Sequence, residues 1–418
     1  MNNPPALARR LGTLDASLIG LGSMIGAGVF AAFTPAAAAA GSGLLVGLVV
    51  AAFVAFCNAT SSAQLAAAYP TSGGTYVYGR ERLGPWPGFL AGWGFVIGKT
   101  ASAAAMAMTF AAYAAPPGWE RPVAIAAVIL LTAVNYHGVT RTAGLTRILV
   151  IAVLAALAIA VAACWGGSGP DFGNVIGDGL LSHGWYGILQ SGGLLFFAFA
   201  GYARIATMGE EVREPRRTIP RAISIALGIT IVVYAVIALT VLSVLGPDGV
   251  AGNPTPLAAA VERGSLAWAA PVVGVGAAVA SLGALLALIA GLGRTSLAMA
   301  REHDLPQALA AVHPRYKVPY RAEVTIAVVV CAIIAVADLR GAIGFSSFGV
   351  LLYYLVANIA AFTQPAADRR YPKALQVLGA IACVVLVATL PPLSVGLGVL
   401  MFAVGVTYRW IRLRAVSG

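Results

Sequence analysis

Apolar runs of about 20 residues recur along the whole chain, and no other feature restricts its fold as strongly. A run of this length crosses the hydrocarbon core of a bilayer as one helix. Of the 418 residues, 60% are hydrophobic and 10% are charged, whereas a soluble protein carries about 25% charged residues. We therefore expect an all-α membrane protein whose helices cross the bilayer many times.

The apolar runs predict twelve transmembrane helices. They lie at residues 13–37, 42–68, 87–114, 122–138, 143–166, 185–209, 219–245, 269–300, 322–338, 342–364, 373–390 and 393–409. With this placement, all loop lysines and arginines except Arg121, Arg263 and Arg340 fall on one side. Cytoplasmic loops carry the excess of these residues, so both termini are expected in the cytoplasm. Lys99 and Arg204 are left inside the membrane.

The first span contains a glycine-rich stretch, Gly-Ser-Met-Ile-Gly-Ala-Gly-Val-Phe, at residues 22–30. Each glycine costs a helix about 1 kcal/mol relative to alanine. A break in a helix within the bilayer is tolerated only where the backbone faces protein or a watery cavity. The stretch therefore predicts an interrupted helix whose bare amides and carbonyls face a ligand. The alternative is close helix packing, which glycines also permit.

A second candidate break lies in the sixth span, where residues 196–205 read Phe-Phe-Ala-Phe-Ala-Gly-Tyr-Ala-Arg-Ile. This stretch has one glycine where the first has three. The first and sixth spans each open a set of five. Paired interruptions at matching places in two halves are typical of inverted-repeat transporters with a site at the membrane midplane.

Four motifs, taken in order, resemble the amino acid–polyamine–organocation superfamily of permeases, in particular bacterial amino acid permeases and cationic amino acid transporters. The motifs are residues 22–30, then Tyr-Pro-Thr-Ser-Gly-Gly-Thr-Tyr-Val-Tyr at 69–78, the run from Phe196 through Gly-Glu-Glu-Val at 209–212, and Arg-Thr-Ser-Leu-Ala-Met-Ala-Arg at 294–301 followed by Asp-Leu-Pro at 304–306. The resemblance covers nearly the whole chain.

The resemblance implies a five-plus-five inverted repeat with discontinuous helices 1 and 6 and two further C-terminal helices. The first repeat would cover residues 13–166, the second 185–364, and the last two spans 373–409. Residues 1–12 and 410–418 would be the cytoplasmic termini. The implied activity is secondary transport by alternating access.

The resemblance also implies a substrate site made largely by the main chain at the two breaks. In such permeases the substrate carboxylate binds the amides of the unwound first span, here Gly26, Ala27 and Gly28. The substrate ammonium meets carbonyls, here about Met24, Phe197 and Ala200, and an aromatic residue (Phe197 or Phe199) caps the substrate. Ile25, Ala198 and Gly201 complete this candidate set.

Two departures from the family pattern draw attention to buried cations. Many sodium-independent members have a lysine in the fifth span, but here that place is apolar, about Val153. After the glycine of the sixth span an acid is common, whereas this chain has Ala203 and then Arg204. A lysine at mid-membrane costs on the order of 3 kcal/mol and therefore normally faces a cavity or a partner. Lys99 is thus a candidate for proton coupling or substrate contact; alternatively it is structural, or reaches the interface.

The remaining charges at span ends form a candidate cytoplasmic gate. Arg204 cannot act as a proton carrier, but it can pair with a substrate carboxylate or with a gate acid. The candidate gate residues are Asp15, Glu210, Glu211, Arg294 and Arg301. For Asp15 the alternative is an anion at a helix N-terminus, and for the others it is simple solvation.

We therefore expect a sodium-independent amino acid transporter that is proton-coupled or an exchanger. The intramembrane cations and the lack of an evident intramembrane acid favour neutral or acidic substrates over cationic ones. The expected partners are an amino acid, the lipid bilayer and, for a proton-coupled carrier, protons, with no cofactor, metal, nucleic acid or obligate protein partner. A membrane sensor with the same site, or a carrier of another amine or organocation, remains an alternative. An enzyme or a channel is disfavoured because neither a catalytic cluster nor a pore-lining repeat is present.

Overall fold

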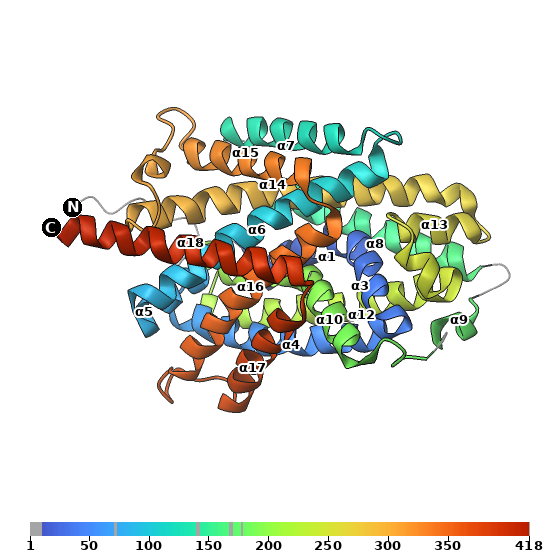
Figure 1. Cartoon of the computed structure of the whole chain (residues 1–418), viewed down its shortest axis with the longest axis horizontal. Coiled ribbons are helices and arrows are strands. Elements are labelled where there is room, and N and C mark those ends of the chain that lie inside the picture. The colour runs from blue at the N-terminus through green and yellow to red at the C-terminus, as the bar shows by residue number, and fades with distance from the viewer. Residues whose placement is uncertain (1–10, 71–72, 139–142, 167–169, 177–178, 418) are drawn as a thin grey trace.

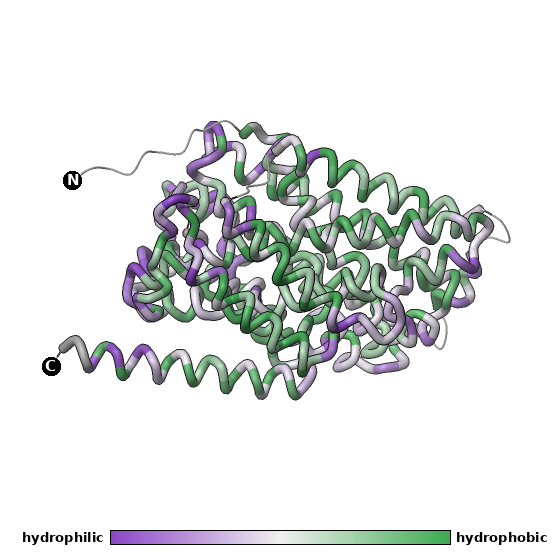
Figure 2. Tube along the Cα trace, turned by 90° about the horizontal axis from the view of Figure 1, so that it is seen from above, coloured by the Kyte–Doolittle hydropathy of each residue, from purple (hydrophilic) through white to green (hydrophobic). Residues whose placement is uncertain are grey.

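The computed structural model describes residues 11–70, 73–138, 143–166, 170–176 and 179–417. Within these ranges the regular secondary structure is helical, apart from an isolated bridge between Leu11 and Val212. Hydrophobic residues fill the middle of the molecule and hydrophilic residues gather toward the two ends of its long axis (Figure 2). The prediction of an all-helical membrane protein is confirmed, because this banding matches helices that cross a bilayer side by side.

The elements follow one another along the chain with few long connections. They are α1 (Thr13–Ile25), α2 (Gly28–Ala31), α3 (Phe33–Ala40), η1 (Gly41–Gly43), α4 (Leu44–Ala68), α5 (Gly74–Leu83), α6 (Pro85–Ala114), α7 (Glu120–Tyr136), α8 (Ala143–Trp165), α9 (Phe172–Ile176), α10 (Gly184–Phe199), η2 (Ala200–Tyr202), α11 (Ala203–Ala206), α12 (Pro215–Ala251), α13 (Pro256–Arg263), η3 (Ala267–Ala269), α14 (Ala270–Arg301), η4 (Gln307–Ala310), α15 (Tyr320–Val336), α16 (Leu339–Phe362), α17 (Lys373–Thr389) and α18 (Pro392–Ser417).

Nine helical stretches in the described part of the chain are long and apolar enough to cross a membrane. They are Thr13–Ala31, Phe33–Ala68, Pro85–Ala114, Gly144–Trp165, Gly184–Ala206, Pro215–Ala251, Ala267–Arg301, Leu339–Phe362 and Pro392–Arg414. The three other predicted spans coincide with α7, α15 and α17, which have 17 residues each. Seventeen residues is the lower limit for a membrane-spanning helix.

Short elements outside the long helices mark the two ends of the molecule (Figure 1). The small helix α5 and the last turns of α18 lie at one end, whereas α9 and α13 lie at the other. The bridge at Leu11 joins the start of the chain to the exit of α11, since the amide of Leu11 donates to the carbonyl of Glu211 at 3.1 Å. The segment before α1 is therefore anchored to the segment that follows α11.

A buried amide network joins α4, α16 and α17 inside the apolar interior. The side chain of Asn358 donates to Oδ1 of Asn58 at 2.6 Å and accepts from the hydroxyl of Ser61 at 2.6 Å. The thiol of Cys383 also reaches Oδ1 of Asn58, at 3.4 Å. Polar side chains buried in an apolar environment need such partners, so this network holds the three helices in one register.

Candidate functional site

The first and sixth predicted spans are both interrupted, and the interruptions pack against each other. Helix α1 ends at Ile25 and α2 begins at Gly28, while α10 ends at Phe199 and continues as η2 and α11. A Cβ atom on Gly201 would lie 2.3 Å from the carbonyl oxygen of Ser23. One on Gly28 would lie 2.6 Å from the Cβ of Ala198. The glycines therefore permit close packing as well as the breaks, so an interrupted helix and close helix packing both apply to the glycine-rich stretch.

Side chains from other helices hold the carbonyls that the breaks expose. The hydroxyl of Tyr234 on α12 lies 2.6 Å from the carbonyl oxygen of Met24 and 3.0 Å from that of Ala198. The carbonyl oxygen of Ala200 accepts from Nζ of Lys99 at 3.3 Å and from the hydroxyl of Tyr354 at 3.4 Å. Because each freed carbonyl needs a donor inside a membrane, these side chains fix both breaks in position.

A cavity of about 380 Å³ begins at the break of the sixth span and extends toward α5. Its walls come from the two breaks, α5, α6, the exit of α11 and one face of α14. The lining residues are Ser23, Gly73, Tyr76, Val77, Phe95, Lys99, Met106, Ala200, Gly201, Ala203, Arg204, Thr207, Glu210, Glu211, Ala284, Ala287, Leu288, Gly291, Arg294, Thr295 and Ala298. This volume is typical of a small-molecule pocket.

Charged side chains line the cavity along its length. Lys99 is 7% exposed and lies against the break. A nitrogen of Arg204, which also lines the cavity, lies 3.8 Å from a carboxylate oxygen of Glu211. Glu210 and Arg294 also line the wall. The cavity thus holds three cations and two carboxylates, and the two acids predicted for the gate share it with Lys99.

The structure places only some of the predicted substrate-binding residues at the cavity wall. Ala200 and Gly201 line it, together with Ser23, which directly precedes the predicted set in the first span. The others lie behind the wall; they are Met24, Ile25, Gly26, Ala27, Gly28, Phe197, Ala198 and Phe199. Phe199 packs on the ring of Tyr234, with centroids 5.0 Å apart. The aromatic residues at the wall are instead Tyr76 and Phe95.

Of the five predicted gate residues, three line the cavity and two do not. Glu210, Glu211 and Arg294 meet at the cavity. Asp15 lies in the first turn of α1, where its carboxylate accepts from Arg147 of α8 at 2.6 Å, and Arg301 is exposed at the end of α14. Asp15 therefore fits its alternative reading as an anion at a helix N-terminus.

A second, much smaller cavity lies beside the first break. Its volume is about 20 Å³, and its walls include Gly22, Gly26 and Val153. Val153 is the fifth-span position where the family resemblance leads one to expect a lysine. Only apolar side chains and small residues surround this cavity, so its walls offer no side chain that could hold a cation.

The sequence analysis missed one acid inside a predicted span. Glu323 is 2% exposed in the first turn of α15, and the charge of Arg294 acts on it. The expectation of no intramembrane acid did not take Glu323 into account. Its position within the predicted span 322–338 could have indicated it. An acid next to the end of a span is, however, expected to be solvated, and only the packing shows that it is buried.

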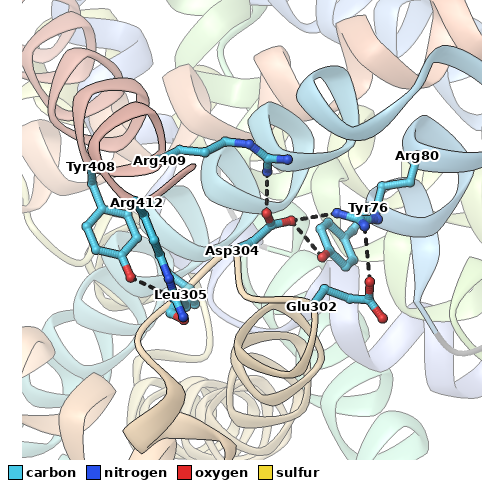
Figure 3. A network of polar contacts seen from close by, with 8 residues as sticks. All are labelled: Tyr76, Arg80, Glu302, Asp304, Leu305, Tyr408, Arg409 and Arg412. Atoms are coloured by element: carbon cyan, nitrogen blue, oxygen red, sulfur yellow. Dashed lines mark hydrogen bonds and ion pairs between the residues drawn. The ribbon is translucent and has the colours of Figure 1, made fainter. Parts of the chain in front are cut away.

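A polar network behind Tyr76 joins α5, the loop after α14, and α18 (Figure 3). The carboxylate of Asp304 accepts from the hydroxyl of Tyr76 at 2.8 Å and from Arg80 at 2.9 Å. It also bonds to Arg409 of α18, whose guanidinium lies over the rings of Trp86 and Phe89. Tyr76 lines the cavity, so this network anchors one of its walls.

Gly201 offers a direct test of the close packing between the breaks. We expect Gly201→Val to destabilise the protein by about 1–3 kcal/mol, the usual cost of forcing extra methyl groups into a packed interior. The neighbouring atoms are backbone and cannot rotate away. Thermal unfolding in detergent measures the loss. Gly228→Val is the control, because a Cβ at Gly228 meets nothing within 4 Å; equal stability of the two variants would contradict the packing.

These features define a multi-pass helical membrane protein with a charged cavity beside two interrupted helices. Comparison with known proteins gives the family. The model of the amino acid permease family matches residues 11–411. An uncharacterized transporter of Mycobacterium tuberculosis is 58% identical over 98% of this chain and 92% of its own length.

More distant relatives carry more specific names. The branched-chain amino acid permease BcaP of Bacillus subtilis is 26% identical over 75% of this chain and 72% of its own length. The cationic amino acid transporter 7 of Arabidopsis thaliana is 26% identical over 85% of this chain and 65% of its own length. The chain belongs to the amino acid permease family, and the predicted resemblance is confirmed. It is a family of transporters and not of enzymes.

Proposed function

We propose that this protein is a secondary transporter that carries amino acids across the bacterial cell membrane by alternating access. The observation that carries the proposal is the cavity that leads from the broken sixth span to α5. On the far side of the first break, Tyr113 packs on Phe30 with ring centroids 5.8 Å apart. A site with a cavity on one side of the breaks and aromatic packing on the other is what one state of an alternating-access cycle requires.

The proposed architecture has twelve spans in a five-plus-five inverted repeat. The repeats are residues 13–166 and 185–364, followed by two spans at 373–409. Both termini, residues 1–12 and 410–418, would be cytoplasmic. The interruptions of α1 and α10 support this division, because each falls in the first helix of its repeat. The cavity would then open to the cytoplasm. Arg9, Arg10 and Arg141, which contribute to the predicted charge bias, lie outside the described residues.

The proposed substrate is a neutral or acidic amino acid. Lys99 and Arg294 are not matched by a carboxylate within salt-bridge distance among the described residues, whereas Arg204 pairs with Glu211. An extra positive charge on the substrate would therefore meet repulsion near the break. The name of BcaP agrees with a neutral substrate, and the name of the Arabidopsis relative keeps a cationic one as the alternative.

The proposed coupling is independent of sodium and uses Lys99, either with protons or in an exchange cycle. The small cavity at Val153 supports independence from sodium, because its apolar walls lack the oxygen side chains that hard cations prefer. The contact between Lys99 and the carbonyl of Ala200 supports a role of Lys99 in coupling. That carbonyl belongs to the set expected to bind the substrate ammonium, so Lys99 and the substrate would compete for it.

Proteoliposome uptake tests the proposal. We expect labelled leucine or glutamate to enter vesicles that hold the purified protein and to exchange with unlabelled amino acid inside. Arginine and agmatine test a cationic amino acid and a different organocation. The counterflow arm separates a carrier from a sensor, since a sensor binds amino acid without exchanging it across the membrane. Binding without counterflow would favour the sensor and contradict the proposal.

A further inference from the structure

Glu323 occupies an unusual position for a carboxylate. It lies in the first turn of α15, it is 2% exposed, and its Oε2 atom makes no hydrogen bond with any residue that the structure describes. Its Cγ would be 2.7 Å from a Cβ atom on Gly293 of α14. The missing side chain of Gly293 thus leaves the space that Glu323 fills. A buried carboxylate without a full set of donors is costly unless it binds a proton or gains a partner.

The residue next to Gly293 connects Glu323 with the transport cavity. Arg294 lines the cavity, and its positive charge acts on Glu323. Arg294 thus lines the cavity, and its charge also acts on an acid that is not part of the cavity wall. When Glu323 is ionised, its charge offsets that of Arg294. When Glu323 carries a proton, Arg294 presents its full charge to the cavity.

We propose that Glu323 is a proton-binding residue that sets the charge Arg294 offers to a substrate carboxylate in the cavity. A proton on Glu323 strengthens binding of the carboxylate, and loss of the proton weakens it. This inference rests on the proposed function and adds a regulating group to the same site. It differs from the proposed role of Lys99, because Glu323 controls affinity and Lys99 contacts the break.

Other ionisable groups surround α15 and define what the test must separate. The elements that pack on it are α6, α7, α14 and η4. Their charged or titratable groups, with those of the adjoining described loops and of α15 itself, are Lys99, Tyr113, Glu120, Arg121, Tyr136, His137, Arg294, Arg301, Glu302, His303, Asp304, His313, Arg315, Tyr316, Lys317, Tyr320, Arg321, Cys331 and Asp338. His313 is part of an aromatic cluster with Tyr136 and Tyr320, at centroid distances of 5.2 and 5.6 Å. Histidines titrate near neutral pH, so a pH effect must be traced to residue 323.

The first experiment needs no substrate. Thermal unfolding in detergent is measured from about pH 5.5 to pH 8 for the wild type, Glu323→Gln, Arg294→Gln and the exposed control Glu262→Gln. We expect the wild type and the control to lose stability as the pH rises, because an ionised Glu323 is costlier to bury than a protonated one. Glu323→Gln should not show this loss of stability. Arg294→Gln should continue to lose stability up to a higher pH than the wild type, because no neighbouring cation then favours ionisation of Glu323 in the folded state.

The second experiment measures counterflow of labelled leucine and labelled glutamate with equal pH on both sides of the vesicle. We expect the wild-type half-saturation concentration to rise at least about fivefold from pH 5.5 to pH 8, a typical size for coupling between two sites. Glu323→Gln should keep the low value throughout.

If stability and half-saturation concentration depend on pH in the wild type and keep that dependence in Glu323→Gln, the effect belongs to a histidine or to Lys99 and the inference is overturned. A wild type in which neither quantity depends on pH would overturn it too. If the unfolding data show the expected pattern but no amino acid exchanges, the proposed function fails while the proton-binding pair of Glu323 and Arg294 stands.

Discussion

Lys99→Met is expected to lower proton-driven accumulation of amino acid at least about tenfold while leaving exchange across the membrane measurable. Lys99 is buried at the cavity and donates to the carbonyl of Ala200 at 3.3 Å. In the proposed cycle a protonated lysine holds this carbonyl, and a neutral lysine, which is a weaker donor, yields it to the substrate ammonium. Methionine has a similar length and no charge, so it removes the proton-dependent step and leaves the breaks free to bind. A tenfold loss corresponds to about 1.4 kcal/mol of coupling free energy.

Two further variants make the Lys99 result interpretable. Lys99→Arg keeps a positive charge that cannot be lost, so it should also fail to couple. Lys373→Met removes an exposed lysine at the start of α17 and should behave as the wild type. Uptake is measured in proteoliposomes with and without an inward proton gradient. Full gradient-driven accumulation by Lys99→Met would show that the lysine is structural, and loss of exchange as well would make it part of the pocket.

Asp304→Ala is expected to destabilise the protein by about 3–5 kcal/mol, because it leaves a buried guanidinium without its counter-charge. The side chains of Asp304 and Arg409 are 4% and 7% exposed. The substitution also removes the acceptor for the hydroxyl of Tyr76 and for Arg80. Figure 3 shows that these partners come from α5 and α18, so their link through the loop after α14 would be lost. Thermal unfolding of the purified protein in detergent measures the effect.

Glu302→Ala is the matched control for Asp304. Glu302 also pairs with Arg80, at 3.0 Å, but its side chain is 55% exposed. Exposed ion pairs contribute about 0–1 kcal/mol. The double variant Asp304→Ala with Arg409→Met should recover part of the lost stability, since it removes the unpaired charge. A melting temperature of Asp304→Ala close to that of the control would contradict a structural role for this network.

Much of the helical organisation could be predicted from local sequence. Long apolar runs predict where helices lie, because the bilayer accepts little else, and the glycines at residues 22–28 predicted where the first of them breaks. The single glycine of the sixth span gave a weaker signal, and its reason became visible only in the packing. Gly201 lies against the backbone of Ser23 and Met24, a contact between residues far apart in the chain.

The candidate site was predicted only in part. The sequence named Lys99, Arg204, Glu210, Glu211 and Arg294, all of which line the cavity. The same reasoning included Asp15 and Arg301, which lie elsewhere, and it overlooked Glu323. Charge and position along a helix do not reveal which face of the helix a side chain occupies. That face determines whether the side chain meets the cavity, the lipid or a loop.

The sequence by itself determined the class of protein, its apolar helices and the family to which it belongs, because these depend on composition, run length and short motifs. Only the tertiary structure decided which charges meet. The contact of Lys99 with Ala200, the buried pair of Asp304 and Arg409, and the effect of the Arg294 charge on Glu323 each join residues on different elements. Such contacts depend on how helices rotate and approach one another, and a linear pattern does not contain that information.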